Sequence, residues 1–212
     1  MSGTPPLPET GSAREDSPKR QQILDGARRM FLQKGFEGAS MQDVARAAEV
    51  SKGTLYVYFD SKEAMFQALV LEECDRMQEA MRRIATGTGS VEQELHAIGR
   101  QMLLTLLQPE VLAAMRMMIG AAEKFPDLAR QIYASGPARS IRTLSEYLEL
   151  RCLRGDLRID DCHAASAEFL DLVVAGLQRR ALLMMPLLSD EDIELHVASR
   201  VSRFLSGRLP TP

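Results

Sequence analysis

The sequence predicts an all-α protein of about nine helices, in which a small helix-turn-helix head precedes a larger helical-bundle body. Through most of the 212 residues, apolar side chains recur every three or four positions, as they do on the buried face of a helix. No segment shows the strict alternation of polar and apolar residues that is typical of a half-buried strand. Proline and glycine interrupt the helical pattern, and these interruptions mark the predicted helix ends.

The composition indicates a globular chain of the reducing cytoplasm. The 45% hydrophobic content is ordinary for a soluble protein, and a run of about 18 apolar residues, which would predict a membrane span, does not occur. Residues 1–17 do not have the pattern of a secretory signal, and their prolines and small polar residues predict a disordered leader. The three cysteines, Cys74, Cys152 and Cys162, are too few and too scattered for a disulfide framework. Reduced thiols are therefore expected, with a redox switch as the less favoured alternative.

The first helix of the head has clear start and stop signals. Pro18 suits its first turn, with Ser17 as the capping residue. Gly35 predicts its end, because glycine readily takes the left-handed conformation found at helix stops. Phe36 is then expected to fold back onto Phe31.

Two short helices joined by a tight turn follow. Ser40 and Asp43 form a Ser-x-x-Asp capping box that begins the first of them. Glu49 and Val50 make the turn, and Ser51 caps the second helix. A helix pair of this size is the smallest arrangement that places one helix in the major groove of DNA.

The second helix of the pair is predicted to have one buried face and one outer face of small side chains. Leu55 and Phe59, four residues apart, are expected to point into the core. Gly53, Thr54 and Val57 lie on the opposite side, where little bulk projects and another surface can approach closely.

Residues around this outer face are candidates for contact with DNA. Lysines near helix starts and tyrosine hydroxyls suit phosphate oxygens, whereas short or amide side chains can reach base edges. The base-facing candidates are Gln42, Gly53 and Thr54, beside Val57, and the phosphate candidates are Ser40, Lys52, Tyr56, Tyr58 and Lys62. A buried helix pair with solvated lysines is the alternative, because short motifs often match by chance.

The charge distribution favours a nucleic-acid partner for the head alone. The whole chain has a net charge of −3. Residues 18–62, the predicted head, contain eight basic and five acidic residues, a net charge of +3, so the rest of the chain carries −6. A modestly basic head on an acidic body suits docking to phosphates through one end.

The body is expected to be helical throughout. A connecting helix over 61–84 leads from the head, and Thr86 to Ser90 break the pattern. The body then extends over 85–206, with a frayed tail at 207–212. Its predicted helices cover 95–106, 111–122, 127–153 with an interruption at Gly136–Pro137, 162–185 and 189–205.

Residues 23–66, ILDGARRMFLQKGFEGASMQDVARAAEVSKGTLYVYFDSKEAMF, closely resemble the N-terminal DNA-binding domain of the TetR/AcrR family of bacterial transcription regulators. SKGTLYVYFDSKEAMF is the most specific part. Val57 departs from the family pattern, which often has a polar or aromatic residue there, and Ala39 replaces a frequent threonine. Residues 116–148, RMMIGAAEKFPDLARQIYASGPARSIRTLSEYL, are similar to the subgroup with AefR-like C-terminal domains.

The resemblance implies a homodimeric regulator, most often a repressor, that binds a palindromic DNA operator and is released by a small apolar or amphipathic effector. It implies an effector pocket in the body, where flexible methionines and aromatic residues gather. By residue pattern alone, a plain hydrophobic core is the favoured interpretation of these side chains. The pocket candidates are Met102, Met115, Met118, Phe125, Tyr133, Tyr147 and Phe169.

The last two helices have apolar residues on more than one side. Such helices need a second surface to cover them, and pairing with the same helices of a second chain would form a four-helix interface. Burial within one subunit is the alternative, and the resemblance favours the dimer. The interface candidates are Leu170, Val173, Val174, Leu177, Val197, Val201 and Phe204.

No cofactor, metal site or catalytic set is predicted. His96, His163 and His196 lie on separate predicted helices, and Asp160 to His163 are better explained as a helix cap than as metal ligands. An enzyme is therefore the least favoured class. A DNA-bound protein of the same fold, with a protein partner in place of a small-molecule effector, is the main alternative.

Overall fold

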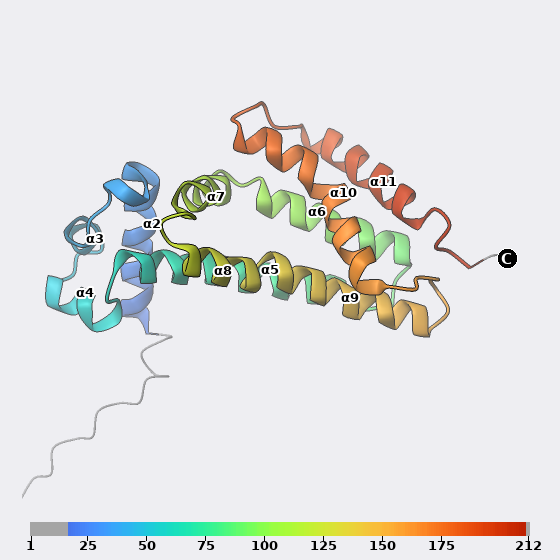
Figure 1. Ribbon diagram of the computed structural model, residues 1–212, viewed down its shortest axis with the longest axis horizontal. Helices are drawn as coiled ribbons and strands as arrows, with labels where there is room; N and C mark the ends of the chain where they lie inside the picture. Colours follow the sequence, from blue (N-terminus) through green and yellow to red (C-terminus); the bar gives the residue numbers. More distant parts are fainter. Residues whose placement is uncertain (1–16, 211–212) are drawn as a thin grey trace, which may run out of the picture. The chain divides into compact units, whose positions relative to one another are not determined.

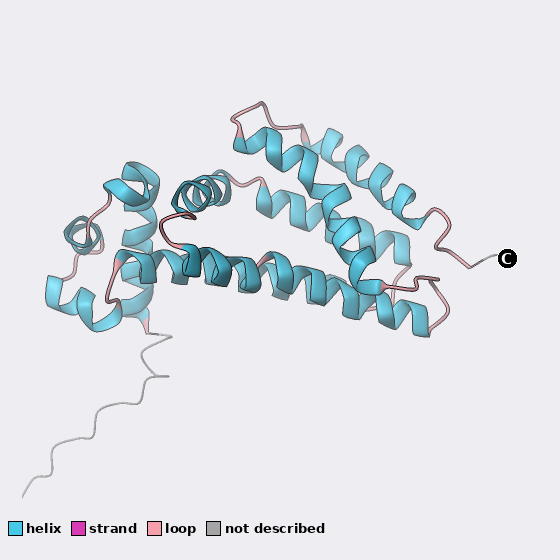
Figure 2. Cartoon of the chain, viewed as in Figure 1, coloured by secondary structure: helices cyan, strands magenta, loops and turns pink. Residues whose placement is uncertain are grey.

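The computed structural model describes residues 17–210, so most of the predicted leader lies outside the described residues. These residues form helices labelled α2 to α11 and contain no strand (Figures 1 and 2). The prediction of an all-α fold is confirmed. The chain divides into two compact units, one ending at Val70 and the other beginning at Leu71.

Helix α2 (Pro18–Gly38) begins and bends where the sequence predicts. The Ser17 side chain accepts a hydrogen bond from the backbone N–H of Arg20, and Pro18 occupies the first turn. Gly35 interrupts the helical conformation with a φ of 71°. The chain then turns back so that the rings of Phe31 and Phe36 lie 5.6 Å apart. The predicted contact between these two rings is confirmed.

Helices α3 (Met41–Ala47) and α4 (Lys52–Tyr58) form the helix-turn-helix pair. The capping box at Ser40 is complete, and Glu49 makes the turn with a left-handed φ of 53°. Helix α3 crosses α2 so closely that a Cβ on Gly26 would lie 2.7 Å from the Cβ of Ala48. Only a glycine at position 26 permits this approach.

Side chains of α2 also hold the turn of the pair from behind. Gln22 donates to the carbonyl of Ala48 at 2.6 Å, and Arg29 donates to the carbonyl of Ala47. These contacts satisfy carbonyls at the end of α3, which have no partners within the helix itself.

Helix α5 (Lys62–Ile84) belongs to both units, because the division at Val70 and Leu71 falls within it. The hydroxyl of Ser61 accepts from the backbone N–H of Ala64 at 3.1 Å and so begins the helix. In the first unit, Phe66 of α5 completes an aromatic cluster with the two phenylalanines that flank Gly35.

The second unit contains the remaining helices. They are α6 (Val91–Leu106), α7 (Pro109–Ala121), α8 (Pro126–Ser135), α9 (Pro137–Leu153), α10 (Cys162–Leu182) and α11 (Asp190–Leu205). The break between α8 and α9 falls at Gly136, as predicted from the Gly-Pro pair. Helix α10 packs against α6, α9 and α11 (Figure 1), and the fully buried rings of Phe169 and Phe204 meet between α10 and α11.

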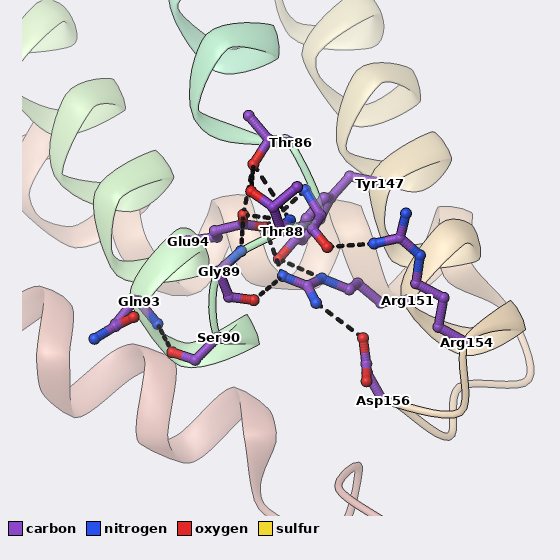
Figure 3. A network of polar contacts seen from close by, with 11 residues as sticks. Thr86, Thr88, Gly89, Ser90, Gln93, Glu94, Tyr147, Arg151, Arg154 and Asp156 are labelled. Atoms are coloured by element: carbon purple, nitrogen blue, oxygen red, sulfur yellow. Dashed lines mark hydrogen bonds and ion pairs between the residues drawn. The ribbon is translucent and has the colours of Figure 1, made fainter.

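A buried polar network ties the α5–α6 connection to α9 (Figure 3). The Arg151 guanidinium donates to the Glu94 carboxylate at 2.7 Å, to Asp156 at 2.8 Å and to the carbonyl of Gly89 at 2.6 Å. The backbone N–H groups of Gly87, Thr88 and Gly89 donate to the same Glu94 carboxylate. Burial acts to raise the pKa of Glu94, yet the N–H of Gly89 and the Arg151 guanidinium together lower it to about 2.

Arg208, within the expected frayed tail, is hydrogen-bonded to residues elsewhere in the second unit. The carbonyl of Arg208 accepts from the N–H of Arg158 at 2.8 Å, and its guanidinium donates to Glu168 at 2.6 Å.

Within residues 17–210, no single helix combines the length and hydropathy of a membrane span. Helices α6 and α7 reach these values only as a pair, bent by 69°.

Candidate functional site

The outer face of α4 is open to solvent, and its back is buried. Leu55 is fully buried and Phe59 is 6% exposed, whereas Val57 is 59% exposed and Tyr56 is 44% exposed. Lys52 and Gly53 are also exposed, and Thr54 and Tyr58 are half-buried. The structure therefore places the predicted base-facing side of α4 outward.

The start of α4 is held rigidly by its own cap. The Ser51 hydroxyl accepts from the backbone N–H of Thr54 at 3.0 Å, and the two hydroxyls share a hydrogen bond of 2.7 Å. A fixed Thr54 hydroxyl at the edge of an exposed helix is a pre-oriented polar group for a ligand surface.

Gly53 is not required by the fold of the chain. A Cβ at this position would meet only the Ser51 hydroxyl oxygen, at 3.8 Å, which is an ordinary contact distance. Glycine inside a helix is less favourable than alanine by about 1 kcal/mol. The missing side chain leaves the helix backbone accessible from outside, as close contact with DNA requires.

The remaining predicted DNA contacts differ in their surroundings. Gln42 on α3 is exposed, and the Lys52 ammonium lies 5.9 Å from the centre of the Tyr56 ring. The Ser40 hydroxyl already serves the capping box, where it donates to Asp43 at 2.7 Å. Hydrogen bonds from Lys34 and Ser40 lower the pKa of Asp43 from 3.8 to about 2, so the carboxylate of this box also keeps its charge in mildly acidic solution.

Lys62 has an intramolecular role that the sequence did not indicate. Its ammonium donates to the carbonyls of Phe36 and Glu37 at 2.9 and 3.3 Å and lies 4.7 Å from the centre of the Phe36 ring. Carbonyls at a helix end attract a cation. Lys62 therefore fixes the end of α2 to the start of α5, and the phosphate contact expected of it from the sequence stays a prediction.

The body contains a hollow of about 580 Å³ between α5 and α6. Helix α6 contributes an amide and a hydroxyl to the lining of the hollow, and α5 contributes charged residues together with the apolar Met77 and Ala80. The lining residues are Glu73, Asp75, Arg76, Met77, Glu79, Ala80, Arg83, Gln101, Thr105 and Gln108. Gln101 and Thr105 lie four residues apart in the largely apolar second half of α6, and Gln108 follows that helix; this spacing was the available sequence signal for the hollow.

None of the predicted pocket residues lines this hollow. Met102, Tyr147 and Phe169 are packed in the hydrophobic core of the second unit. Tyr133 is 60% exposed, and Met115, Met118 and Phe125 are half-buried. Periodicity places an apolar residue on an inner face, but it does not distinguish a core from a cavity.

The predicted dimer residues are largely buried within the single chain. Val197 and Phe204 are fully buried, Val173 and Val201 are 1% exposed, Leu170 and Val174 are 8% exposed, and Leu177 is half-buried. They fill the core between α6, α10 and α11, the alternative that the sequence left open. The exposed apolar residues of these helices and their connection are Leu183, Met184, Met185, Leu187 and Leu195.

Comparison with known families supports the assignment made from the helix pair. Residues 23–69 match the profile of bacterial regulatory proteins of the tetR family, and residues 93–207 match that of the AefR-like transcriptional repressor C-terminal domain. The chain belongs to the TetR family. The predicted family and its AefR-like subgroup are confirmed.

Several TetR-family relatives resemble this chain at different lengths. The regulator UidR of Escherichia coli is 37% identical over 84 residues, which are 40% of this chain and 43% of UidR, so the chain spans less than half of that relative. The repressor Rv1474c of Mycobacterium tuberculosis is 29% identical over 162 residues, covering 76% of this chain and 81% of the relative.

Solved TetR-family structures share the complete fold. A putative TetR-family regulator from Mesorhizobium loti superposes with a TM-score of 0.86 at 26% identity, covering 95% of this chain and all of the other. The flavonoid-responsive regulator FrrA superposes with a TM-score of 0.78 at 34% identity, covering 92% of this chain and 98% of FrrA.

Proposed function

We propose that this TetR-family protein is a cytoplasmic homodimeric repressor that binds a palindromic operator and is released by a small amphipathic effector. The observation that supports DNA binding most directly is the outer face of α4. On this face, Gly53 is not required by the fold, and the Thr54 hydroxyl is held by a hydrogen bond. Lys52 and Tyr56 are exposed beside them, and Leu55 anchors the helix in the core. A helix with these features suits insertion into a major groove.

In this proposal, one group of residues recognises the bases and another binds the phosphate backbone. Thr54, Gly53 and Gln42 face base edges, while Lys52, Tyr56 and Tyr58 bind phosphates. Ser40 and Lys62 act mainly by holding α3 and the end of α2 in position, because their polar atoms already bond within the chain.

The hollow between α5 and α6 is the proposed effector site. Its amides and hydroxyl suit a ligand with several hydrogen-bonding groups, and Met77 and Ala80 supply apolar contact. FrrA, which this chain resembles over most of its length, is described as responsive to flavonoids. Flavonoids, which are flat aromatic rings with several hydroxyls, are therefore the first ligand class to test.

Dimerisation is proposed through the outward side of α11 and the connection between α10 and α11. Leu183, Met184 and Leu195 are exposed by 68%, 75% and 65%, and a partner copy would bury them. A two-fold dimer presents two α4 helices to two half-sites, which compensates for the small positive charge of one head. Effector binding and DNA binding must then weaken each other reciprocally.

The test is footprinting on the DNA upstream of the gene for this chain, with and without a flavonoid panel. We expect protection of a palindrome and its loss when an active flavonoid is added. Tyr56→Phe should weaken this protection without lowering the Tm. Failure to protect any upstream site at low salt would contradict the proposal. Protection that no small molecule relieves would favour a protein partner in place of an effector.

A further inference from the structure

Two thiols from different helices meet in the second unit. Cys152 lies in the last turn of α9, and Cys162 is the first residue of α10. Their sulfur atoms are 3.9 Å apart, which is close to van der Waals contact. Both side chains are half-buried.

The connection between α9 and α10 builds this approach. Gly155 turns the chain with a φ of 80°, and Leu157 is 3% exposed, so the loop is anchored in the core. Asp156 of the same loop is held by Arg151, the residue next to Cys152. The Sγ atom of Cys152 also lies 4.0 Å from the carbonyl oxygen of Ile159. The two sulfurs are thus brought together by a defined loop conformation.

We propose that Cys152 and Cys162 are an oxidation site, a dithiol that a hydroperoxide converts into an intrachain disulfide. A disulfide bond is about 2.0 Å long, so the sulfurs must approach by about 1.9 Å. Both cysteines sit at helix ends beside the loop, where side-chain rotation and small backbone shifts can supply this movement. Neither the family assignment nor the proposed repressor function assigns a role to these thiols.

The reaction is balanced with the hydroperoxide as oxidant. One thiolate attacks the terminal peroxide oxygen, the O–O bond breaks, and the sulfur becomes a sulfenic acid while an alcohol leaves. The second sulfur displaces the sulfenic oxygen, which departs as water with the second thiol proton. Two electrons pass from the two thiols to the peroxide.

The surroundings of Cys162 keep its sulfur in the less reactive thiol form at neutral pH. Burial, together with the neighbouring Cys152, raises the pKa of the Cys162 thiol to about 11. Since the thiolate is the nucleophile, attack by Cys162 is slow at neutral pH and accelerates as the pH rises. Reduction is slow as well, because a thiolate of high pKa is a poor leaving group in thiol exchange.

The disulfide would tie the end of α9 to the start of α10 beside the Arg151 network. Closing this short loop removes freedom from the unfolded chain, so the oxidised protein should be more heat-resistant. We expect an increase in Tm of several degrees.

The test uses the reduced full-length chain and tert-butyl hydroperoxide, followed by alkylation of remaining thiols, trypsin digestion and mass spectrometry. Trypsin cleaves after Arg151, Arg154 and Arg158, so the expected disulfide joins two otherwise separate peptides. Finding Cys152 and Cys162 alkylated, converted to separate oxidised acids, or linked between chains would overturn the proposal. This mapping on the wild-type chain does not depend on the folding of any variant.

Cys74 supplies the matched control. It is also half-buried, but it lies on α5 against Gly136. Cys74→Ser should keep the disulfide and the rise in Tm on oxidation, whereas Cys152→Ser and Cys162→Ser should lose both. An equal rise in Tm in the Cys162→Ser variant would show that the effect has another origin.

Discussion

The outer face of α4 and the Glu94–Arg151 network use polar residues in opposite ways. On α4, the exposed side chains of Lys52 and Tyr56 each carry one polar group that another molecule can reach. In the network, a carboxylate and a guanidinium are almost completely buried and are bonded to each other and to backbone groups. The first arrangement suits recognition, and the second fixes the connection between helices. Residue type alone does not separate these roles, whereas burial and hydrogen-bond partners do.

The largest effect is expected for Arg151→Met, which tests whether the network is structural. The substitution leaves the Glu94 carboxylate buried without its main cationic partner, and breaking a buried ion pair typically costs about 3–5 kcal/mol. Urea unfolding of the wild type and the variant measures this loss.

Arg139→Met is the matched control on the same helix. Arg139 pairs with Asp75, whose side chain is 66% exposed, so its loss should cost less than about 1 kcal/mol. Equal losses in the two variants would remove the distinction between the buried network and a surface ion pair.

The pH dependence of unfolding should show the same network through Glu94. The folded-state pKa of about 2 lies below the ordinary value of 4.5, so the charged form stabilises the folded protein. This contribution, on the order of 3 kcal/mol, is complete above about pH 4.5 and is lost as the pH falls toward 2.

Urea unfolding between pH 3 and pH 7 measures this dependence. Glu94→Gln should flatten the fall in stability at acid pH, since the titrating group is gone. Asp43→Asn is the comparison, because hydrogen bonds also lower the pKa of Asp43, which belongs to the capping box of α3 and not to the network. A Glu94→Gln variant with an unchanged acid profile would contradict the assigned pKa.

Two glycines of the first unit should respond oppositely to alanine. Gly26→Ala places a Cβ against Ala48, and such overpacking costs about 1–3 kcal/mol. Gly53→Ala meets no close neighbour, so the free energy of unfolding should stay the same or rise by up to about 1 kcal/mol.

Gly53→Ala should lower operator affinity even though it does not lower stability. The added methyl group of Gly53→Ala lies on the face proposed to contact DNA, so affinity should fall about tenfold, or about 1.4 kcal/mol, without loss of Tm. Fluorescence anisotropy with the footprinted operator measures this. Unchanged affinity would show that the outer face of α4 at Gly53 does not contact DNA.

Local signals made the helices predictable, and long-range contacts did not follow from them. Ser17, Gly35 and Ser51 act within one helical turn of themselves, so their roles could be inferred from neighbouring residues. Glu94 and Arg151 are 57 positions apart, and nothing in either local sequence indicates that they meet. The outward face of α4 was predictable because one short helix needs only one buried stripe.

In the body, the roles of individual apolar residues could not be predicted, for a related reason. Its helices pack against several neighbours at once, so an apolar residue such as Phe169 can belong to a core, a cavity or a dimer surface. Only the arrangement of all the helices shows that it belongs to the core.

The smallest expected effects separate two lysines of the first unit. Lys52 is exposed, so Lys52→Ala should weaken binding to all DNA sequences and flatten the plot of log affinity against log salt by a slope of about one, with no change in Tm. Lys62 bonds to the carbonyls of Phe36 and Glu37, so Lys62→Ala should lower stability by about 1 kcal/mol and leave the salt slope nearly unchanged. Anisotropy titrations at several salt concentrations, together with thermal unfolding, measure both quantities. A slope change of about one in Lys62→Ala at unaltered Tm would restore the phosphate contact predicted from the sequence and would place this lysine with the DNA-facing residues.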